Sequence, residues 1–397
     1  MKNVLIIAYY YKPQNNGGVQ RIVNLKKYLP EFGYNVYVLT TDIEGRCDGE
    51  TNVLRFTDKG NEYSHQRTAI VSYPFKILRE LLVYFGIVGD WFYWWKKEVI
   101  RNFEDQVKDI NFDYIISSFP PIMDLEIGEY LSDKYNIPLI VDYRDGLMHL
   151  PFRYINEKSY FFQKRTIELE RRVSEKSKLN IVVNDSMEKY YKERYSTKVL
   201  KIENGFDTEE LFDENVKFEL PKGFNIVYTG ALARSRGAVE LSSVLKIIND
   251  NTDVNFVFIG EYTLGEINTL SKIENVHVYP KQRRDVIIPI QRSADILLLC
   301  SGDIEGGTSG KLYEYIFSGT PILNLGRRNS ASEIISKTMT GKTFLEGDIK
   351  EIKEFISQVR EGHYKISPKD LEDYTRKNQI RKLALALDEV EMESNKK

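Results

Sequence analysis

Short apolar runs alternate with helical stretches along this chain, and the alternation starts again near its middle. Residues 4–8 form a continuous apolar run, which is typical of a parallel strand buried on both faces. A loop containing two glycines, a helical pattern over residues 19–32 and a second strand pattern over residues 35–40 follow. This order is a βαβ unit, and it predicts an α/β protein with parallel sheets.

The alternation of strands and helices continues through the first half of the chain and starts again in the second half, which predicts two domains. In the first half, strands are expected at residues 114–117, 139–142 and 179–183, with helices near 123–134 and 157–177. A second series comprises strands at residues 224–229, 255–260, 276–279, 296–299 and 321–324, with a helix over about 238–249. We therefore expect two doubly wound, Rossmann-like domains that face a cleft, where the ligands of such sheets bind.

The length agrees with this division, because 397 residues exceed the about 100–200 residues of one ordinary domain. We place the N-terminal domain at residues 1–205 and a linker at 206–222. The C-terminal domain is expected at 223–370, and a charged amphipathic helix within 371–397 can pack back on the N-terminal domain.

Composition excludes several classes of protein. The chain has 56 Lys and Arg against 58 Asp and Glu, spread along its length, which argues against a nucleic-acid-binding protein. A hydrophobic fraction of 42% is too high for a disordered chain. Only Cys47 and Cys300 are present, so we expect no disulfide framework and no cysteine metal site, and a cytoplasmic location fits best.

Neither apolar stretch that could reach a membrane has the pattern of a span. The run at the start is too short for a signal peptide, and charged residues interrupt the stretch 73–100. The segment 84–97 nevertheless combines three tryptophans with Lys96 and Lys97, a composition found at lipid headgroups. Ordinary helix packing is the alternative, so the protein is expected to be soluble or peripheral at the inner face of the membrane.

Two loops that follow expected strands are candidates for ligand binding. Gly17 and Gly18 stand just before a helix, where missing side chains and free N–H groups let a phosphate or sugar approach. A flexible turn is the alternative. The second loop begins at Glu305 and leads into a helix that ends at Gly319.

The helix after the second loop carries the most specific pattern in the chain. Thr308 and Ser309 can cap it, and an anion can occupy the same place. Lys311 lies in the first turn, where a cation opposes the helix dipole, so a ligand phosphate explains it better than helix stability does. Glu314, one turn later, can accept two ribose hydroxyls, although a capped helix with a solvated Lys–Glu pair is the alternative. Leu312 after the lysine excludes a phosphate-loop NTPase, which needs Ser or Thr there.

The order of these motifs resembles that of a retaining, family 4-like GT-B glycosyltransferase. The resemblance rests on Gly17-Gly18, Asn204-Gly205-Phe206-Asp207, Thr229-Gly230, and Lys311-Leu312-Tyr313-Glu314-Tyr315 followed by Gly319-Thr320-Pro321-Ile322. Asp142-Tyr143-Arg144-Asp145 and Ser117-Ser118-Phe119-Pro120-Pro121 are similar to a bacterial surface-polysaccharide branch, of the capsular polysaccharide or lipopolysaccharide type.

The resemblance implies a nucleotide-sugar donor, with UDP as the favoured nucleotide, and an acceptor-side N-terminal domain. Glu314 would hold the ribose, and the backbone from Ser309 through Gly310 to Leu312 would approach the diphosphate or sugar. Arg234 and Arg236 after Gly230 would neutralise the leaving diphosphate, as a metal does in other transferases. No Asp-x-Asp is present, so metal independence and no cofactor are expected. Together these expectations give Glu305, Lys311 and Arg236 as catalytic candidates. The donor-binding candidates are Gly17, Gly18, Gly230, Arg234, Arg236, Thr308, Ser309, Gly310, Lys311, Leu312 and Glu314.

Two departures from the family pattern affect the donor sugar. The first glutamate of the family's pair would fall at Gly306, whereas Glu305 stands one position earlier. Ala231 follows Gly230, where the family has arginine.

Acceptor binding is assigned to the other half of the chain. Asp142, Arg144 and Asp145 follow an expected strand and should face the cleft, with an internal Arg–Asp pair as the alternative. The candidates are Asn16, Arg144, Asp145 and His149, the last also readable as a structural histidine. The reaction is expected to join a sugar to a glycan or lipid-linked acceptor. A UDP-sugar 2-epimerase and a non-catalytic partner subunit are the alternative functions.

Overall fold

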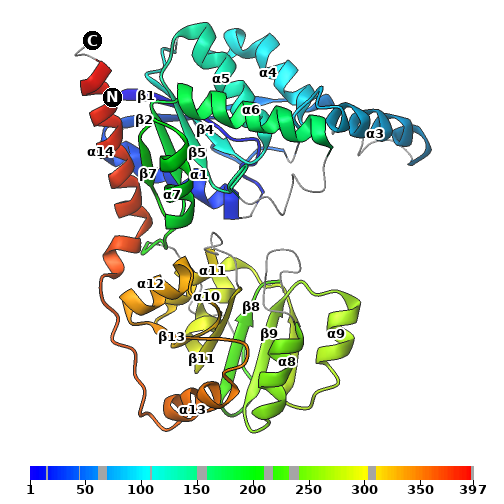
Figure 1. The fold of residues 1–397 in the computed structure, drawn as a ribbon, viewed down its shortest axis with the longest axis vertical. Helices are drawn as coiled ribbons and strands as arrows, with labels where there is room; N and C mark the ends of the chain where they lie inside the picture. The colour runs from blue at the N-terminus through cyan, green and yellow to red at the C-terminus, as the bar shows by residue number, and fades with distance from the viewer. Residues whose placement is uncertain are drawn as a thin grey trace. The chain divides into compact units, whose positions relative to one another are not determined.

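The computed structural model divides into two units, and each has its own parallel sheet (Figure 1). Unit 1 comprises Met1–Glu203 and Lys377–Lys397, and unit 2 comprises Asn204–Arg376. The structure describes residues 1–14, 17–43, 45–60, 69–107, 110–149, 159–209, 218–231, 241–302 and 310–394, with the backbone alone at 69–75, 393 and 394.

Unit 1 is built on a sheet of seven described strands in the order β3-β2-β1-β4-β5-β6-β7, with every neighbouring pair parallel. The strands are β1 Lys2–Ile7, β2 Tyr34–Thr41, β3 Val53–Phe56, β4 Tyr114–Phe119, β5 Leu139–Tyr143, β6 Leu179–Val182 and β7 Val199–Lys201. The helices are α1 Gly17–Tyr28, η1 Leu29–Phe32, α3 Ala69–Tyr84, α4 Tyr93–Gln106, α5 Ile122–Tyr135, α6 Tyr160–Lys176, α7 Asp185–Arg194 and α14 Arg376–Ser394.

Both faces of the unit 1 sheet are buried, as the continuous apolar run of its first strand predicts. Leu5 and Ile7 point into one core cluster, whereas Val4 and Ile6 point into the other. Such double burial is the arrangement of parallel sheets covered by crossover helices.

The C-terminal helix α14 belongs to unit 1. Leu383 and Leu387 pack in the same core cluster as Val4 of β1. The Tyr34 hydroxyl donates to Asp388 Oδ1 at 2.6 Å, and the Tyr114 hydroxyl donates to the Leu387 carbonyl at 3.1 Å. The helix is therefore anchored by apolar burial and by tyrosine hydrogen bonds.

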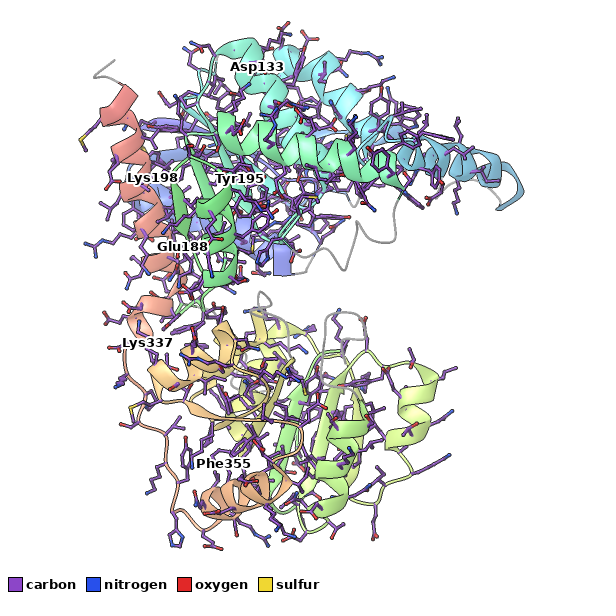
Figure 2. All side chains as sticks on the ribbon, viewed as in Figure 1. Asp133, Glu188, Tyr195, Lys198, Lys337 and Phe355 are labelled. Carbon is purple, nitrogen blue, oxygen red and sulfur yellow. The ribbon has the colours of Figure 1, made fainter. Side chains whose placement is uncertain are left out.

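Unit 2 is built on a sheet of six described strands in the order β10-β9-β8-β11-β12-β13, again with parallel neighbours. The strands are β8 Asn225–Thr229, β9 Asn255–Gly260, β10 Val276–Pro280, β11 Ile296–Gly302, β12 Ile322–Gly326 and β13 Gly341–Phe344. The helices are α8 Leu241–Asp250, α9 Leu264–Leu270, α10 Arg284–Ser293, α11 Gly310–Ser318, α12 Ser330–Thr338, α13 Ile349–Arg360 and η2 Leu371–Tyr374. Figure 2 labels Phe355 of α13, a fully buried ring of the unit 2 core.

The predicted α/β class with parallel sheets is confirmed by both units. The described residues of the expected linker 206–222 lie within unit 2. Phe206 is buried there, and its backbone N–H donates to the Tyr374 carbonyl at 3.0 Å. The polar composition of this stretch suggested a linker, but Phe206 and Phe218 both pack against the core of unit 2.

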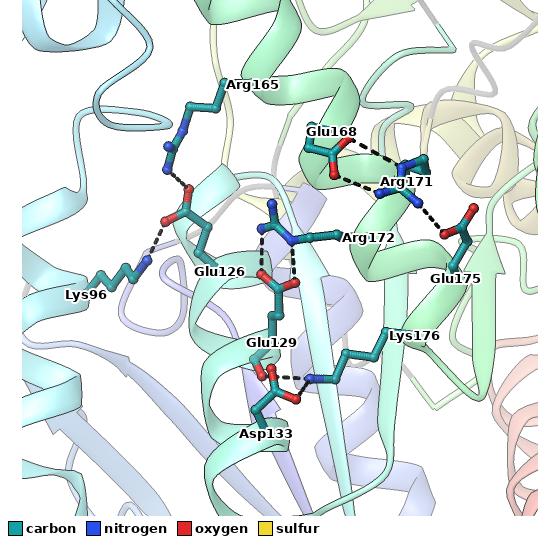
Figure 3. A network of polar contacts seen from close by, with 10 residues as sticks. All are labelled: Lys96, Glu126, Glu129, Asp133, Arg165, Glu168, Arg171, Arg172, Glu175 and Lys176. Atoms are coloured by element: carbon teal, nitrogen blue, oxygen red, sulfur yellow. Dashed lines mark hydrogen bonds and ion pairs between the residues drawn. The ribbon is translucent and has the colours of Figure 1, made fainter.

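The aromatic run near residue 91 serves packing more than the sequence suggested. Trp95 of α4 has an exposed fraction of 0%, and the Phe92 ring packs against Tyr9 in a tilted arrangement with ring centroids 4.2 Å apart. Lys96 pairs with Glu126 of α5, which also pairs with Arg165 of α6 (Figure 3). This shared carboxylate links α4, α5 and α6. Lys96 therefore takes part in packing these helices together.

A second layer of ion pairs joins α5 to α6 (Figure 3). Arg172 donates to both carboxylate oxygens of Glu129, at 2.7 and 2.8 Å, and Lys176 pairs with Asp133. Bidentate Arg–carboxylate pairs fix orientation as well as distance. The two helices therefore keep one register over the sheet.

Candidate functional site

The candidate site of unit 2 lies at the carboxyl ends of β8 and β11, which are neighbours in the sheet. The chain leaves β8 toward β9 on one side and leaves β11 toward β12 on the other, so this is the point where the strand order reverses. Ligands of doubly wound sheets bind at such a switch point. Gly230 follows β8 there, and α11 follows β11 after a loop outside the described residues.

Lys311 reaches across the switch point from the first turn of α11. Its Nζ donates to the Tyr228 hydroxyl at 2.9 Å and to the Ala231 carbonyl at 3.4 Å, and lies 4.4 Å from the Tyr228 ring centroid. Burial lowers the pKa of this lysine to about 8. A cation held close to a helix N-terminus and desolvated in this way is suited to receive an anion.

Gly230 gives Lys311 the room it occupies. The glycine has φ +101°, a left-handed conformation, and a Cβ added there would lie 2.5 Å from Lys311 Cε. Its backbone is fixed on both sides, because its N–H donates to the Ile259 carbonyl at 2.7 Å and its carbonyl accepts from the Tyr262 hydroxyl at 2.9 Å. The structure thus brings together Gly230 and Lys311, which the sequence placed 81 positions apart.

Glu314 lies one turn after Lys311 and is paired with a residue that the sequence reasoning missed. Arg284, the first residue of α10, places Nη1 2.6 Å from Glu314 Oε1. Arg284 begins the helix that follows β10, so the rule that functional residues follow strands could have pointed to it.

The rest of α11 is locked to β8 through the core. The Tyr315 hydroxyl lies 3.0 Å from the Thr229 backbone nitrogen and 3.1 Å from Thr229 Oγ1. Leu312 is fully buried in the core, so its side chain packs and does not face a ligand. Gly310 is exposed at the first turn, with nothing within 4 Å of an added Cβ.

Several predicted residues lie outside the described part of the chain. These are Asn16, Arg234, Arg236, Glu305, Thr308 and Ser309.

In unit 1, Gly17 and Gly18 open α1 after β1, as predicted for the first loop. A Cβ added at Gly17 would meet nothing within 4 Å. The helix start is therefore open on the side of Gly17.

Asp142 does not face a ligand, contrary to expectation. It is the fourth residue of β5 and is fully buried. Arg21 of α1 donates to both of its oxygens, with Nη2 2.7 Å from Oδ1, and the Ser118 hydroxyl donates to Oδ2 at 2.9 Å. A carboxylate satisfied in this way supports the fold, and the sequence did not identify Arg21 as its partner.

Arg144 and Asp145 follow β5 directly. Arg144 donates to the Pro120 carbonyl, and burial lowers the pKa of its guanidinium although Asp142, Asp124 and Asp145 counteract that effect. Asp145 is half-buried. Arg144 thus holds the neighbouring loop by a carbonyl contact, and the expected internal pairing with an acid is taken by Arg21 instead.

His149 is held by α7. Its Nε2 lies 2.8 Å from Ser186 Oγ, and its ring meets Tyr190 edge-on with centroids 5.2 Å apart. The preceding Met148 N–H donates to Glu170 at 2.7 Å. Glu170 also accepts from the hydroxyls of Tyr190, Tyr191 and Tyr195, the last of which Figure 2 labels. This buried carboxylate fixes the loop that carries His149.

Over the described ranges, no three His, Cys, Asp or Glu side chains gather in a way that could hold a metal ion. Nor does any helix in those ranges combine the length and apolar character needed to cross a bilayer.

Comparisons with known proteins match both halves of the chain to sugar transferases. The sequence model of Glycosyltransferase Family 4 matches residues 15–210, and that of Glycosyl transferases group 1 matches residues 209–378. A search of curated proteins by sequence gave no match.

Solved structures are similar in fold over nearly the whole chain. Sucrose-phosphate synthase from Thermosynechococcus elongatus matches with a TM-score of 0.66 and 10% identity, covering 98% of this chain and 95% of that one. Anabaena HepE in complex with UDP-glucose matches with a TM-score of 0.56 and 13% identity, covering all of both chains. WaaG, a glycosyltransferase involved in lipopolysaccharide biosynthesis, matches with a TM-score of 0.55 and 12% identity, covering 97% of this chain and 95% of that one.

Proposed function

This chain belongs to the GT-B glycosyltransferases, family 4-like, and we propose that it transfers a sugar from a UDP-sugar to a glycan or lipid-linked acceptor. We propose further that the transfer retains the anomeric configuration, needs no metal and serves cell-surface polysaccharide synthesis. HepE, a structural neighbour, was solved with UDP-glucose, and WaaG is named for lipopolysaccharide biosynthesis, which supports the choice of donor and pathway class.

The observation that carries the proposal is the position of Lys311 beside Gly230 at the switch point of unit 2. A cation whose pKa is lowered by burial gains charge-assisted hydrogen bonds when a diphosphate arrives, and these are about twice as strong as neutral ones. Glu314, one helical turn away, can accept ribose hydroxyls. Because both residues lie on α11, we propose that one nucleotide engages both, its diphosphate at Lys311 and its ribose at Glu314.

The reaction needs stabilisation of a leaving diphosphate more than it needs a strong base. The bond from the sugar C1 to the β-phosphate oxygen breaks, and a bond from C1 to the acceptor oxygen forms on the same face. The acceptor hydroxyl proton passes to the departing phosphate oxygen, and UDP leaves. Lys311, together with Arg234 and Arg236 in the segment after Gly230, is assigned the charge that develops on the diphosphate. Glu305 is assigned to the donor sugar.

Nucleotide binding is the first test. Thermal unfolding of the full chain is measured with UDP, GDP, ADP and dTDP, because a ligand that binds the native state raises the melting temperature. UDP is expected to raise it most, and no response to any of the four would overturn the proposal.

Glu314→Ala is expected to abolish that response. Glu333→Ala is the matched control, because Glu333 also pairs with an arginine of unit 2, Arg328, at 3.3 Å but lies on α12. Equal nucleotide responses in the two variants would contradict the ribose role of Glu314.

Product analysis separates the alternatives. Incubation with a UDP-sugar and a lipid-linked or glycan acceptor is followed by NMR, where the anomeric coupling of the product reports retention or inversion. An epimer formed from donor alone would assign the protein to the isomerases, and donor binding with no transfer to any acceptor would assign a partner subunit. Unchanged activity after EDTA treatment would support metal independence.

We also propose that unit 1 contacts a membrane, through an apolar surface that differs from the tryptophan run. This α3 surface consists of exposed side chains on α3, on the turn after it and on the first half of α6, namely Ile77, Leu78, Leu81, Tyr84, Phe85, Ile87, Tyr160, Phe161 and Ile167. Phe85 meets Tyr84 and Phe161 with ring centroids 5.3 and 6.1 Å apart, which makes the two helices continuous at the surface. Figure 1 shows α3 extending away from the sheet of unit 1.

The aromatic rings of this surface, together with exposed lysines on the same helices, favour lipid headgroups as its occupant. Lys76 of α3 and Lys164 of α6 are both exposed. Aromatic rings and lysines together are the side chains found at the membrane interface. The test is sedimentation with phosphatidylglycerol-containing vesicles. Leu81→Glu is expected to lower the bound fraction, whereas Leu264→Glu, at an exposed leucine of unit 2, is expected to leave it unchanged. Failure of the unaltered protein to sediment would overturn the membrane contact.

A further inference from the structure

We propose that Arg284 is a positioning residue that orients the Glu314 carboxylate for the donor ribose and so sets discrimination between ribose and deoxyribose. This inference rests on the proposed function and concerns a residue that no motif singled out. Arg284 acts through Glu314, so its effect is expected on the sugar of the nucleotide and not on the diphosphate.

The contact is short and partly desolvated. Arg284 Nη1 lies 2.6 Å from Glu314 Oε1, and the two side chains are 23% and 21% exposed. An ion pair with this little solvent exposure is screened less than a surface pair. Because a carboxylate offers about four acceptor positions, Glu314 keeps capacity for two hydroxyls after accepting from Arg284.

The helices that carry the pair are packed together, which fixes its geometry. Gln291 of α10 is fully buried; its side chain donates to Thr229 Oγ1 at 3.1 Å, and its backbone carbonyl accepts from Thr320 Oγ1 at 2.8 Å. Arg292 of α10 lies 5.1 Å from the ring centroid of Phe317 of α11. The guanidinium therefore approaches Glu314 from a helix whose last turn is held against β8 and α11.

Orientation by Arg284 has a consequence for the ligand. A site built to hydrogen-bond a hydroxyl rejects an analogue that lacks it, because the buried polar group is then left without a partner. If Arg284 is removed, the Glu314 carboxylate can turn toward water, and the loss of the hydroxyl then costs less.

The chain provides a matched control one residue earlier. Arg283 has the same charge, but its side chain is 77% exposed and pairs with Asp285, at 2.7 Å. Arg283→Gln removes one positive charge from the same helix start without touching Glu314. It therefore reports the general electrostatic effect of losing an arginine there.

The experiment measures the affinities of the full chain for UDP and for 2′-deoxy-UDP by calorimetry. The unaltered protein is expected to prefer UDP by about tenfold, a preference that Glu314→Gln removes. Arg284→Gln is expected to weaken UDP binding by about tenfold and to reduce the preference at least threefold. Arg284→Lys, which keeps the charge but loses the planar fork, should give an intermediate preference. Arg283→Gln should keep the full preference.

The outcomes separate this inference from the proposed function. If the unaltered protein binds neither nucleotide, both fail. If it binds UDP without preferring it over 2′-deoxy-UDP, or if Arg284→Gln and Arg284→Lys keep the preference that Glu314→Gln removes, only the role of Arg284 fails. If Arg284→Gln does not fold, the melting temperature shows it, and Arg284→Lys decides the question.

Discussion

Unit 1 places a charged side chain near the end of a parallel strand, Asp142 of β5, and unit 2 places one in the helix that follows a parallel strand, Lys311 of α11, yet the two charges have different partners. In unit 1, Asp142 is fully buried and receives Arg21 and Ser118 on its two oxygens. In unit 2, Lys311 is half-buried and donates to two neutral oxygens, and burial lowers its pKa to about 8.

The difference shows how a structural charge is told from one poised for a ligand. A buried ion pair that satisfies every polar atom supports the fold, and breaking it leaves an uncompensated charge. A desolvated cation at a helix N-terminus is made less stable in its charged form, and an anionic ligand relieves that cost. The position of a charged residue near a strand does not distinguish a structural charge from one that can receive a ligand. The groups to which the charged side chain is hydrogen-bonded do.

Asp142→Ala is expected to have the largest effect, a loss of stability in unit 1, because it leaves Arg21 buried without its counter-ion. The free energy of unfolding of unit 1 should fall by about 3–5 kcal/mol. Trp91, Trp94 and Trp95 are the three tryptophans of the sequence and all lie in unit 1, so urea titration followed by tryptophan fluorescence reports this unit.

Asp145→Ala is the control for that experiment. The residue lies three positions later and is half-buried, so a change within about 0.5 kcal/mol is expected. Equal losses of stability in Asp142→Ala and Asp145→Ala would remove the distinction between a structural and an accessible acid.

Lys311→Gln tests the other side of the comparison. Loss of charge-assisted hydrogen bonds to the diphosphate should weaken UDP binding by about 2 kcal/mol, or roughly thirtyfold, by calorimetry. The tryptophan-monitored stability of unit 1 should not change. Lys337→Gln, at a lysine of unit 2 paired with Asp373 at 3.2 Å, should bind UDP normally (Figure 2). Comparable weakening in that variant would point to a general charge effect.

Gly230→Ala tests the close contact between Gly230 and Lys311 at the same site. The left-handed backbone costs a non-glycine residue about 1–2 kcal/mol, and the new Cβ would displace the Lys311 side chain. Calorimetric unfolding should show a less stable unit 2, and UDP should bind more weakly. Gly265→Ala is the matched control, since a Cβ there meets nothing within 4 Å and alanine favours helix α9 by about 0.5–1 kcal/mol. A stable Gly230→Ala variant with full UDP affinity would contradict the close fit.

The pH dependence of UDP binding is the finest expected effect. Because the pKa of Lys311 is lowered to about 8 in the free protein, UDP must restore its proton above that pH. Affinity should fall by up to about tenfold per pH unit between pH 8 and 9, and Lys311→Gln should lose this dependence. Calorimetry at several pH values measures it, and equal slopes in both proteins would exclude Lys311 as the titrating group.

The free energy of unfolding is expected to change with pH in the opposite direction to the UDP affinity. Between pH 8 and the ordinary lysine pKa of 10.5, the unfolded chain binds more protons at this position than the native one. The contribution of Lys311 to the stability of unit 2 therefore rises with pH over that window. In the absence of nucleotide, the Lys311→Gln variant should lack this rise.

The sequence predicted much of the fold and part of the site, because both depend on local pattern. The apolar run of β1 predicted a strand buried on both faces. The family resemblance named Gly230 and Lys311 as donor-binding candidates, and the structure places them side by side. The short edge strand β3, with four residues, was missed because so brief a run carries no clear periodicity. For Trp95 the sequence left membrane contact and helix packing open, and the structure places this side chain in the core.

Two pairings mark the limit of the sequence. Arg21 and Asp142 are 121 positions apart, and Arg284 and Glu314 are 30 positions apart. The local sequence around one residue therefore does not predict the other member of either ion pair. The alternation of strands and helices determined the two parallel sheets and the positions of the loops proposed to bind ligands, because hydrophobic periodicity is a local property. Tertiary structure alone decided which charges were neutralised inside the protein and which stayed accessible, because an ion pair depends on which elements pack together.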